Sequence, residues 1–346
     1  MNINNYNRVG WDVGGAHLKA VMLDANGVVV EAIQCACPLW QGIDQLSVAI
    51  SQILIDLKSR SSDHRHAVTM TGELADIFKH RREGVLAIGH CLQQHLDAPK
   101  FYAAGQGLVA SSDLEEMHER VASTNWHASA ALLARMLGSG LLMDIGSTTT
   151  DLIVLQDGKA LHAGLSDAER LRMNELVYTG VVRTPLMALA QHIEFKSAQY
   201  GLAAEHFATT ADIYRLTGEL KKTDDMYGTA DGSDKSQIAN MRRLARMIGH
   251  DLEDATQEDW HTLANTFRAK QKALITEAAR ELLTRYSLPQ SSPVIALGAG
   301  SFLVDAIAVE LGRTCVHAED LIKAESDEKR HWAGMCFPAF AVASLL

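Results

Sequence analysis

A short pattern that occurs twice constrains the fold of this chain more than any other feature. In each copy an apolar strand ends in Asp-x-Gly, and a second strand follows the turn. The first copy is Asp12-Val13-Gly14-Gly15 and the second is Asp144-Ile145-Gly146-Ser147, so that the aspartates, and likewise the first glycines, lie 132 residues apart. Equal spacing over the same order of strand, turn and strand indicates an internal duplication. We therefore expect two related lobes, each built around one copy.

The segments around each copy have the pattern of a β-meander. Residues 10–13, 18–23 and 28–36 predict three antiparallel strands, with Asn26-Gly27 as a hairpin signal between the last two. Residues 141–145, 151–155 and 160–165 predict the same arrangement in the second copy. A strand follows each glycine turn, whereas a P-loop or a dinucleotide-binding turn needs a helix there. Both of those phosphate-binding motifs are therefore excluded at these turns.

The rest of the chain predicts a mixed α/β protein. A length of 346 residues exceeds what one core usually serves, which also favours two lobes. Apolar periodicity predicts a strand at 67–70, an α/β alternation over 85–121, and helices at 43–59, 74–84, 125–137, 236–248, 256–286 and 305–311. Ser123 or Thr124 is a candidate N-cap for the helix at 125–137. The polar segment 224–235 is expected to be a mobile loop, because it contains Gly228 and Gly232 among polar residues.

Composition and charge narrow the class of partner. The formal net charge of −10 argues against a general nucleic-acid binder, which needs a basic face. It does not argue against phosphate ligands, which backbone N–H groups and metal ions can hold. The five cysteines form no C-x-x-C pair, so neither a disulfide framework nor a structural zinc site is expected. No segment has the pattern of a secretory signal or a membrane span, and the cytoplasm is the expected location.

The two Asp-x-Gly turns are the expected centre of the chemistry. A carboxylate at the end of a buried strand is costly unless a cation or a hydrogen-bond donor meets it. Gly14, Gly15 and Gly146 would let backbone N–H groups approach a phosphate closely. Two such turns that face each other, with Asp12 and Asp144 between them, would suit a polyphosphate with Mg²⁺. We therefore expect Asp12 and Asp144 to be metal ligands.

A third glycine-containing segment follows another short strand. Residues 293–297 predict a buried strand, and Gly298-Ala299-Gly300 separates it from a helix. Gly298 and Gly300 would bring N–H groups and a helix dipole to a nucleotide or phosphate. Close packing of helix on strand is the alternative explanation for these glycines.

The order hairpin, hairpin, strand–glycine–helix resembles the superfamily of actin, Hsp70 and the sugar kinases. The resemblance implies an α/β fold of two RNase H-like lobes with a ligand cleft between them. The first lobe would comprise residues 7–122 plus 331–346, and the second would comprise residues 123–330 with a helical insertion. The last helix, at 331–346, would return to the first lobe.

Five segments give a narrower match. Together they resemble the hydantoinase/oxoprolinase-related family linked to tetrahydromethanopterin-dependent C1 metabolism: VTMTGELAD (68–76), NWHASA (125–130), DIGSTTTD (144–151), ELVYTGVVRTP (175–185) and TADGSDKS (229–236). The family includes a synthase of methanofuran biosynthesis. That enzyme joins an aminomethylfuran diphosphate to the phenol oxygen of a γ-glutamyl-tyramine and releases pyrophosphate. The resemblance implies a transferase of this type, with a tyrosine-type phenol as another candidate acceptor.

This reaction implies a role for each candidate residue. Lys19 and Arg183 would contact phosphate, Ser147, Thr148 and Thr149 would add hydroxyl donors, and Glu73 or Asp151 would accept the phenol proton. Alternatives remain open at this stage. Lys19 would otherwise reach solvent, Arg183 would pair with Glu175, Glu73 would be a helix-start charge, and the threonines would be plain strand residues. His17 replaces an Asn expected in this family, while His127 is expected to pack or cap and Asp231 to be a solvated loop acid.

Two other functional classes stay open. An ATP-dependent small-molecule kinase or ATP-driven hydrolase would use the usual ligand of the superfamily, whereas the leading interpretation does not require ATP. A non-catalytic nucleotide sensor would close on its ligand without turnover. The expected partners are a small-molecule diphosphate and a phenolic acceptor, with no nucleic acid and no membrane, and a homodimer is left open.

Overall fold

The computed structural model describes residues 7–58 and 64–346, and the chain divides into two compact units. Unit 1 comprises Met1–Ser139, Leu155–Arg170 and His317–Leu346, and unit 2 comprises Gly140–Val154 and Leu171–Val316. Residues 123–139 therefore group with unit 1. The predicted lobes, 7–122 plus 331–346 and 123–330, stay a prediction, because compactness alone does not define where a lobe begins.

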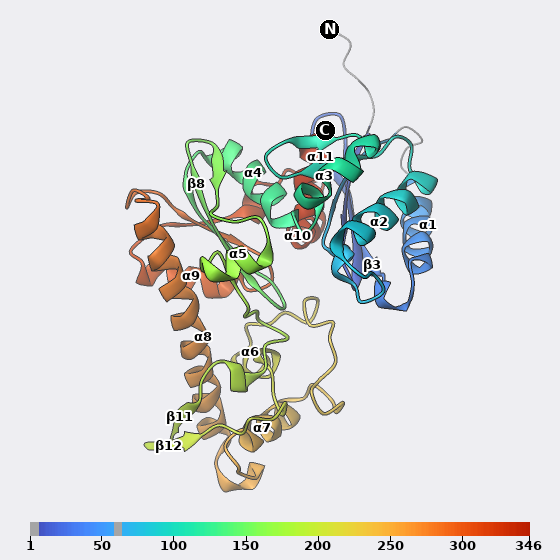
Figure 1. The fold of residues 1–346 in the computed structure, drawn as a ribbon. Helices are drawn as coiled ribbons and strands as arrows, with labels where there is room; N and C mark the ends of the chain where they lie inside the picture. The colour runs from blue at the N-terminus through green and yellow to red at the C-terminus, as the bar shows by residue number, and fades with distance from the viewer. Residues whose placement is uncertain (1–6, 59–63) are drawn as a thin grey trace. The chain divides into compact units, whose positions relative to one another are not determined.

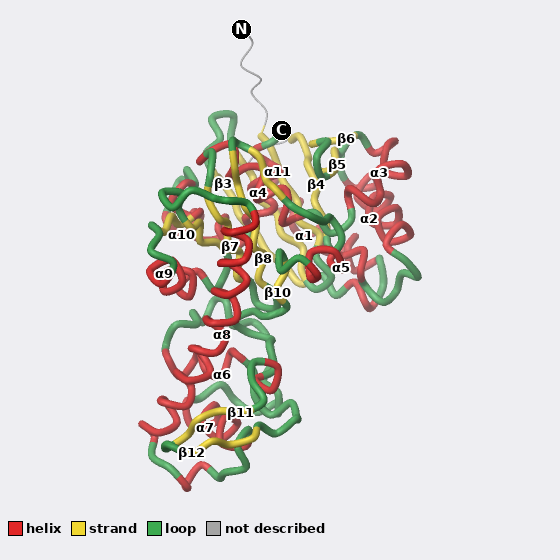
Figure 2. Tube along the Cα trace, turned by 60° about the vertical axis from the view of Figure 1, so that its left-hand side comes forward, coloured by secondary structure: helices red, strands yellow, loops and turns green. Residues whose placement is uncertain are grey.

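The sheet of unit 1 has the strand order β3-β2-β1-β4-β5-β6. Its first three strands are the predicted antiparallel meander, β1 (Asn7–Val13), β2 (His17–Leu23) and β3 (Val29–Ala36). β4 (His64–Met70) lies parallel to β1, β5 (Lys100–Ala103) lies parallel to β4, and β6 (Gly107–Val109) closes the edge antiparallel to β5. Figure 2 shows these strands beside the helices that cover them. The meander predicted from the first Asp-x-Gly copy is confirmed.

Alternation along β1 assigns its two faces. Val9, Trp11 and Val13 belong to a core cluster with residues of α1 (Asp44–Lys58) and α2 (Arg81–His95). Successive strand residues point to opposite faces, so Gly10 and Asp12 lie on the other face. There α11 (Phe337–Ser344) packs on β1, β2 and β4, and it also contacts α4 (Asn125–Leu137). α3 (Leu114–Val121) and α10 (Asp327–Met335) complete the helices of this unit.

The sheet of unit 2 has the order β10-β8-β7-β13-β14, and β9 pairs with β8. β7 (Gly140–Ile145), β8 (Thr150–Gln156) and β9 (Lys159–Leu161) are the second copy, although the third strand ends before the predicted residue 165. β10 is Leu176–Val177, β13 (Val294–Leu297) is parallel to β7, and β14 is Cys315–His317. The unit boundaries fall within β8, β14 and α5 (Asp167–Arg172). α9 (Ser301–Glu310) follows β13 and contacts it.

The remainder of unit 2 is mainly helical (Figure 1). It holds the hairpin β11–β12 (His192–Phe195 and Ala198–Gly201) and the helices α6 (Thr210–Thr217), α7 (Gln237–Arg246) and α8 (Gln257–Arg285). Thr256 caps α8 by accepting from the Asp259 N–H, which is why this helix starts where its sequence predicts. Short 3₁₀ helices lie at Leu39–Gln41, Gly72–Leu74, Ser111–Asp113, Leu186–Ala188, Leu252–Asp254 and Ala318–Leu321.

Several predicted helix boundaries are wrong for local reasons. The helix predicted at 74–84 is a 3₁₀ turn at Gly72–Leu74 followed by bends, and α2 begins only at Arg81, where His80 accepts from the Glu83 N–H. The last helix is two helices, since the chain turns at Cys336 before Pro338. The helix at 305–311 begins earlier, at Ser301. The predicted end of the first helix, Ser59, lies outside the described residues.

No helix among the described residues is both long enough and apolar enough to span a bilayer.

The contact between β1 and α11 gives a test of the fold of unit 1. A Cβ at Gly10 would meet Ala339 O at 1.9 Å and Ala343 N at 2.7 Å. We expect Gly10→Ala to lower the free energy of unfolding by about 3 kcal/mol, because backbone atoms cannot move aside cheaply. Gly15→Ala is the matched control, since nothing lies within 4 Å of its added Cβ. Urea unfolding that gives equal stability for the two variants would contradict this packing.

Candidate active site

Asp12 lies one residue before the end of β1, between two polar side chains on the same face of the sheet. Its register partners are Lys19 on β2 and Thr69 on β4. Asp12 is 4% exposed, and neither its Oδ1 nor the buried Oγ1 of Thr69 has a hydrogen-bond partner in the described chain. Buried polar atoms are nearly always satisfied in folded proteins. The edge of the first sheet therefore offers two oxygen atoms to a ligand, cation or water.

Burial controls the electrostatics of this edge. It raises the pKa of Asp12 above its ordinary value, and the charge of Lys19 lowers that pKa in part. Lys19 is half-buried and its Nζ donates to Met335 O at 3.2 Å, at the end of α10. The alternative that Lys19 simply reaches solvent is not what the structure shows. Its ammonium lies where an anion at this edge would be attracted.

The first glycine turn leaves backbone donors open. Gly14 N–H donates to His17 O at 3.0 Å and closes the turn. The N–H groups of Gly15 and Ala16 donate to no acceptor among the described residues. Burial, and then the charge of Lys19, lowers the pKa of His17, which favours the neutral imidazole. A turn with two free N–H groups has the form expected of an anion cradle.

Glu73 lies beside this turn and is almost completely buried. Thr71 N–H donates to Val13 O at 2.9 Å, and a Cβ at Gly72 would lie 3.2 Å from Gly14 O, so the segment before Glu73 rests on the turn. Ser123 Oγ donates to Glu73 Oε1 at 2.5 Å, whereas Oε2 is buried without a hydrogen-bond partner in the described chain. Burial raises the pKa of Glu73 above its ordinary value. Glu73 lies in the first turn of the 3₁₀ helix Gly72–Leu74, so it is a helix-start charge, although a buried one.

The second glycine turn repeats the first within unit 2. Gly146 N–H donates to Thr149 O at 2.9 Å, while the N–H groups of Ser147, Thr148 and Thr149 donate to no described residue. The loop at residues 181–183 is hydrogen-bonded to this turn: Val181 N–H donates to Gly146 O, and Arg183 N–H donates to Ser147 O. The carbonyls of Gly146 and Ser147 are thus occupied, while the amides of Ser147, Thr148 and Thr149 remain open among the described residues. Both copies of the duplicated pattern share this property.

Asp144 and the third glycine segment meet at the same edge. Asp144 pairs with Leu297 across β7 and β13, and a Cβ at Gly298 would lie 2.5 Å from Asp144 Oδ1. Gly298 has φ +83°, a conformation that favours glycine. Gly300 N–H donates to Ile145 O at 2.8 Å, and a Cβ there would lie 2.4 Å from Ile145 Cγ2. Close packing of helix on strand is therefore real, and it also brings the N-terminus of α9 beside Asp144.

Arg183 does not pair with Glu175. Its guanidinium lies over the Tyr227 ring at 5.2 Å, and the side chain is exposed. Glu175 is buried and accepts from Tyr286 OH at 2.9 Å. Arg183 is thus available at the second turn, whose Ser147 carbonyl its own N–H contacts. Asp151, the other candidate proton acceptor, is half-buried on β8 opposite Leu176.

The segment 224–235, predicted to be a mobile loop, is held by two arginines. Arg215 donates to both carboxylate oxygens of Asp225 at 2.7 Å. Arg243 is fully buried and donates to Asp212 at 2.8 Å and to Asp231 at 3.0 Å. Hydrogen bonds from the Ser233 hydroxyl and N–H, and then the charge of Arg243, hold the pKa of Asp231 at about 2. Asp231 is an exposed loop acid, as expected, and its bond to Arg243 also ties this segment to α7.

Some residues that shape the sites were missed from the sequence. The sequence identifies Ser123 only as a candidate cap of α4. Neither Ser123 nor Thr124 caps this helix with its side chain, because the Ser123 hydroxyl donates to Glu73 and the Thr124 hydroxyl donates to Val121 O. Thr69 gave no signal beyond a strand pattern. His127 packs as expected, since its Nδ1 lies 2.8 Å from Tyr102 OH and burial lowers its pKa to about 4.

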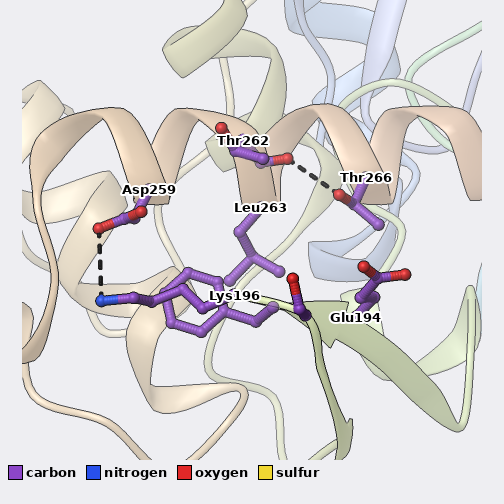
Figure 3. Close-up of a pocket in the computed structure, with 8 residues that line it drawn as sticks. Glu194, Lys196, Asp259, Thr262, Leu263 and Thr266 are labelled. Atoms are coloured by element: carbon purple, nitrogen blue, oxygen red, sulfur yellow. Dashed lines mark hydrogen bonds and ion pairs between the residues drawn. The ribbon is translucent and has the colours of Figure 1, made fainter.

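A surface pocket of about 370 Å³ lies away from all of these residues, between the β11–β12 hairpin and α8 (Figure 3). Leu263 lies in its lining, and Lys196 pairs with Asp259 across one side at 3.7 Å. None of the predicted site residues lines this pocket. The candidate residues therefore lie at a sheet edge within each unit and not at this pocket.

The chain has the α/β fold of the sugar kinase and actin-like ATPase class, with one six-stranded sheet in unit 1 and a second one mainly in unit 2. A ROK family glucokinase from Streptomyces griseus, in complex with glucose and AMPPNP, matches with a TM-score of 0.50 at 13% identity and 98% coverage of both chains. The nucleotide-free structure of an acetone carboxylase matches with a TM-score of 0.56 at 10% identity, covering 98% of this chain and 70% of that one.

Sequence comparison then identifies the family. The hydantoinase/oxoprolinase family model matches residues 64–326, so the chain belongs to that family. A protein of Methanocaldococcus jannaschii named (4-{4-[2-(gamma-L-glutamylamino)ethyl]phenoxymethyl}furan-2-yl)methanamine synthase is 30% identical over 342 residues, covering 98% of this chain and 97% of that protein. A protein of the same name from Methanococcus vannielii is 29% identical over 206 residues, covering 60% and 90%.

The buried acids of unit 1 predict an unusual pH dependence of stability. Burial raises the pKa of Asp12 and of Glu73 in the fold above the values of 3.8 and 4.5. The folded chain thus binds more protons than the unfolded chain once pH exceeds those values, and stability falls as pH rises through the folded pKa. Without ligand, Asp12→Asn and Glu73→Gln should each melt about 2 °C or more above wild type at pH 8. Near pH 4 this gain should vanish; a pH-independent difference would contradict the assignment.

Gly298 provides a test of the geometry around Asp144. Gly298→Ala adds left-handed strain of about 1 kcal/mol and an overlap with Asp144 Oδ1 and Ile145 O, both 2.5 Å from the new Cβ. Gly218→Ala is the control, because its φ is +77° and nothing lies within 4 Å of its added Cβ. We expect Gly298→Ala to cost about 1–3 kcal/mol more than the control in urea unfolding. Equal costs would show that Asp144 and Gly298 are not in contact.

Proposed function

We propose that this protein is a transferase of methanofuran-type cofactor biosynthesis. It joins an aminomethylfuran diphosphate to the phenol oxygen of a γ-glutamyl-tyramine, or of a related tyrosine-type acceptor, and releases pyrophosphate. The observation that carries the proposal is the 30% identity over 98% of the chain to a synthase whose name describes a phenoxymethyl furan ether. The open amides of both glycine turns supply the physical support, since the leaving group of this reaction is an anion.

The leaving group defines the first task of the site. As the bond from the furan methylene to the diphosphate oxygen breaks, its electron pair leaves with pyrophosphate, and charge builds up on phosphate oxygens. N–H groups aimed at those oxygens stabilise them without reorganising during the reaction. We assign this role to the N–H groups of Gly15 and Ala16 in unit 1 and of Ser147, Thr148 and Thr149 in unit 2, while Gly14 and Gly146 close the two turns. Lys19 and Arg183 add positive charge, and Gly298 and Gly300 present the N-terminus of α9.

The chemistry of the acids fits Mg²⁺. Carboxylate oxygens are among its preferred ligands, and Oδ1 of Asp12 is buried without a hydrogen-bond partner in the described chain. We assign Asp12 in unit 1 and Asp144 in unit 2 as the residues that hold it. When bound, Mg²⁺ would neutralise charge on the diphosphate. ATP is not required by this reaction.

The acceptor must lose a proton as its oxygen forms the new bond. Glu73 and Asp151 are the candidate acceptors, and we favour Glu73 because its Oε2 is buried and free of other hydrogen bonds in the described chain. A base with a raised pKa is suited to proton transfer near neutral pH. The phenol proton passes to Glu73, the phenol oxygen pair forms the ether bond, and pyrophosphate leaves with the other pair.

An ATP-dependent kinase or ATP-driven hydrolase is the second candidate. The observation in its favour is the fold shared with a glucokinase whose structure holds AMPPNP. Gly298 and Gly300, beside α9, would then contact a nucleotide. Binding of ATP with ADP release that depends on a substrate would support this candidate over the synthase.

The wider setting follows from the resemblance alone. We place the reaction in the cytoplasm, upstream of tetrahydromethanopterin-linked C1 transfer, with small molecules as the only required partners. Whether two chains associate does not affect the chemistry proposed for either set of residues.

The decisive assay uses purified protein with the aminomethylfuran diphosphate, γ-glutamyl-tyramine and Mg²⁺. We expect release of pyrophosphate together with an ether product of the expected mass. Asp12→Asn should reduce kcat by about 10²–10³-fold, because an electrostatic contact to the leaving group is lost. Glu116→Gln, an exposed acid on α3, is the control and should leave kcat unchanged. Wild-type protein that releases no pyrophosphate and forms no ether would refute the proposed function.

A further inference from the structure

Ser123 has a backbone conformation that its own residue type does not favour. It lies just before α4 with φ 52°, in the left-handed region, where non-glycine residues are uncommon. It is 4% exposed, and it is not a side-chain cap of the helix that follows. Strain of this kind persists only where the surroundings impose it, and it concentrates at functional sites.

The conformation of Ser123 directs its hydroxyl to Glu73. The Oγ donates to Glu73 Oε1 at 2.5 Å, between residues fifty positions apart in the chain. This bond occupies one carboxyl oxygen and leaves Oε2, which is buried and has no hydrogen-bond partner in the described chain. Because this hydrogen bond fixes the position of Oε1, it also fixes the direction in which Oε2 points.

The surroundings of Glu73 reinforce this orientation. A Cβ at Gly84 would meet the Glu73 backbone at 2.6 Å, so α2 presses directly on this residue. Two charged groups act on the carboxyl, Arg81 from α2 and Asp167 from α5, and these two pair with each other at 3.1 Å. Arg81 lowers the pKa of Glu73 and Asp167 raises it, and both act less strongly than the hydrogen bonds from the Ser123 hydroxyl and from the Glu73 N–H.

We propose that Ser123 is a positioning residue for the proton acceptor Glu73, holding Oε1 so that Oε2 faces the phenol of the acceptor substrate. This inference rests on the proposed function. Ser123 acts through Glu73 and touches neither substrate. During the reaction the phenol O–H bond breaks, its proton goes to Oε2, and the Ser123 bond to Oε1 stabilises the carboxylate that must be present beforehand.

The proposed role of Ser123 predicts the direction of a measurable change in the pKa of Glu73. A hydrogen bond to the charged form of an acid lowers its pKa, so loss of the Ser123 hydroxyl raises the pKa of Glu73. The fraction of Glu73 ionised at a given pH then falls, and the acidic limb of the kcat/KM profile moves to higher pH. A charge-assisted hydrogen bond accounts for a shift of about one pH unit, or about tenfold in rate on that limb.

Two variants separate positioning from folding. Ser123→Ala removes the hydroxyl and keeps the left-handed strain, whereas Ser123→Gly removes the hydroxyl and relieves the strain. We expect Ser123→Gly to melt at or above the temperature of Ser123→Ala. Both should nevertheless show the same upward shift of the acidic limb, by about one pH unit. If activity instead follows stability, with Ser123→Gly equal to wild type at every pH, the proposal is overturned.

A measurement without substrate keeps this inference separate from the proposed function. Carbon-13 labelling of glutamate carboxyls, with Glu73→Gln to assign the signal, follows the titration of Glu73 by NMR. The Glu73 midpoint should rise by about one unit in Ser123→Gly, and an unchanged midpoint would refute the hydrogen-bond role. An unshifted profile in Glu73→Gln, with ether formation retained, would assign the proton to another acceptor such as Asp151 and overturn the inference while the proposed function stands. Wild-type protein without ether formation overturns both.

Discussion

Asp12 is buried, and its Oδ1 has no hydrogen-bond partner among the described residues; the rest of the account depends on this constraint. A carboxyl in that position destabilises the ligand-free fold, and burial raises its pKa as a consequence. Gly10 has no side chain, so α11 can pack against the face of β1 that carries Asp12. This packing shields the carboxyl from water. Thr69 and Lys19 flank the acid from neighbouring strands. The fold keeps this buried carboxyl although it lowers stability, as is expected where an acid serves to bind a cation beside an anion.

The duplicated Asp-x-Gly segment gives unit 2 a turn of the same kind. Each copy closes its turn with one bond from the first glycine, and the following amides have no acceptor among the described residues. In unit 2 the loop that carries Val181 and Arg183 occupies the carbonyls of Gly146 and Ser147. Gly298 and Gly300 then bring α9 against Ile145. The shared feature is an excess of N–H donors beside an acid, and it suits a diphosphate whose charge grows as it leaves.

The parts of the fold with strong local periodicity could be predicted from the sequence. Both Asp-x-Gly copies, the helix at 125–137 and the long helix after Thr256 appear where their patterns place them. The segment after Glu73 was misjudged, because close contact with Gly84 and the first turn overrides its helical pattern. Ser123 and Thr69 could not be recognised, since their importance arises from partners distant in the chain. The same holds for Arg243, whose buried bonds to Asp212 and Asp231 fix a segment that looks like a free loop.

The central claim is that the open backbone amides of each glycine turn bind phosphate oxygens. Nitrogen-15 NMR of the labelled protein, titrated with pyrophosphate and Mg²⁺, tests this claim at the atoms concerned. The account predicts that the amide signals of Gly15, Ala16, Ser147 and Thr148 shift on titration, and that Asp12→Asn weakens the response of Gly15 and Ala16. Pyrophosphate that shifts amides elsewhere while these four stay unchanged would contradict it.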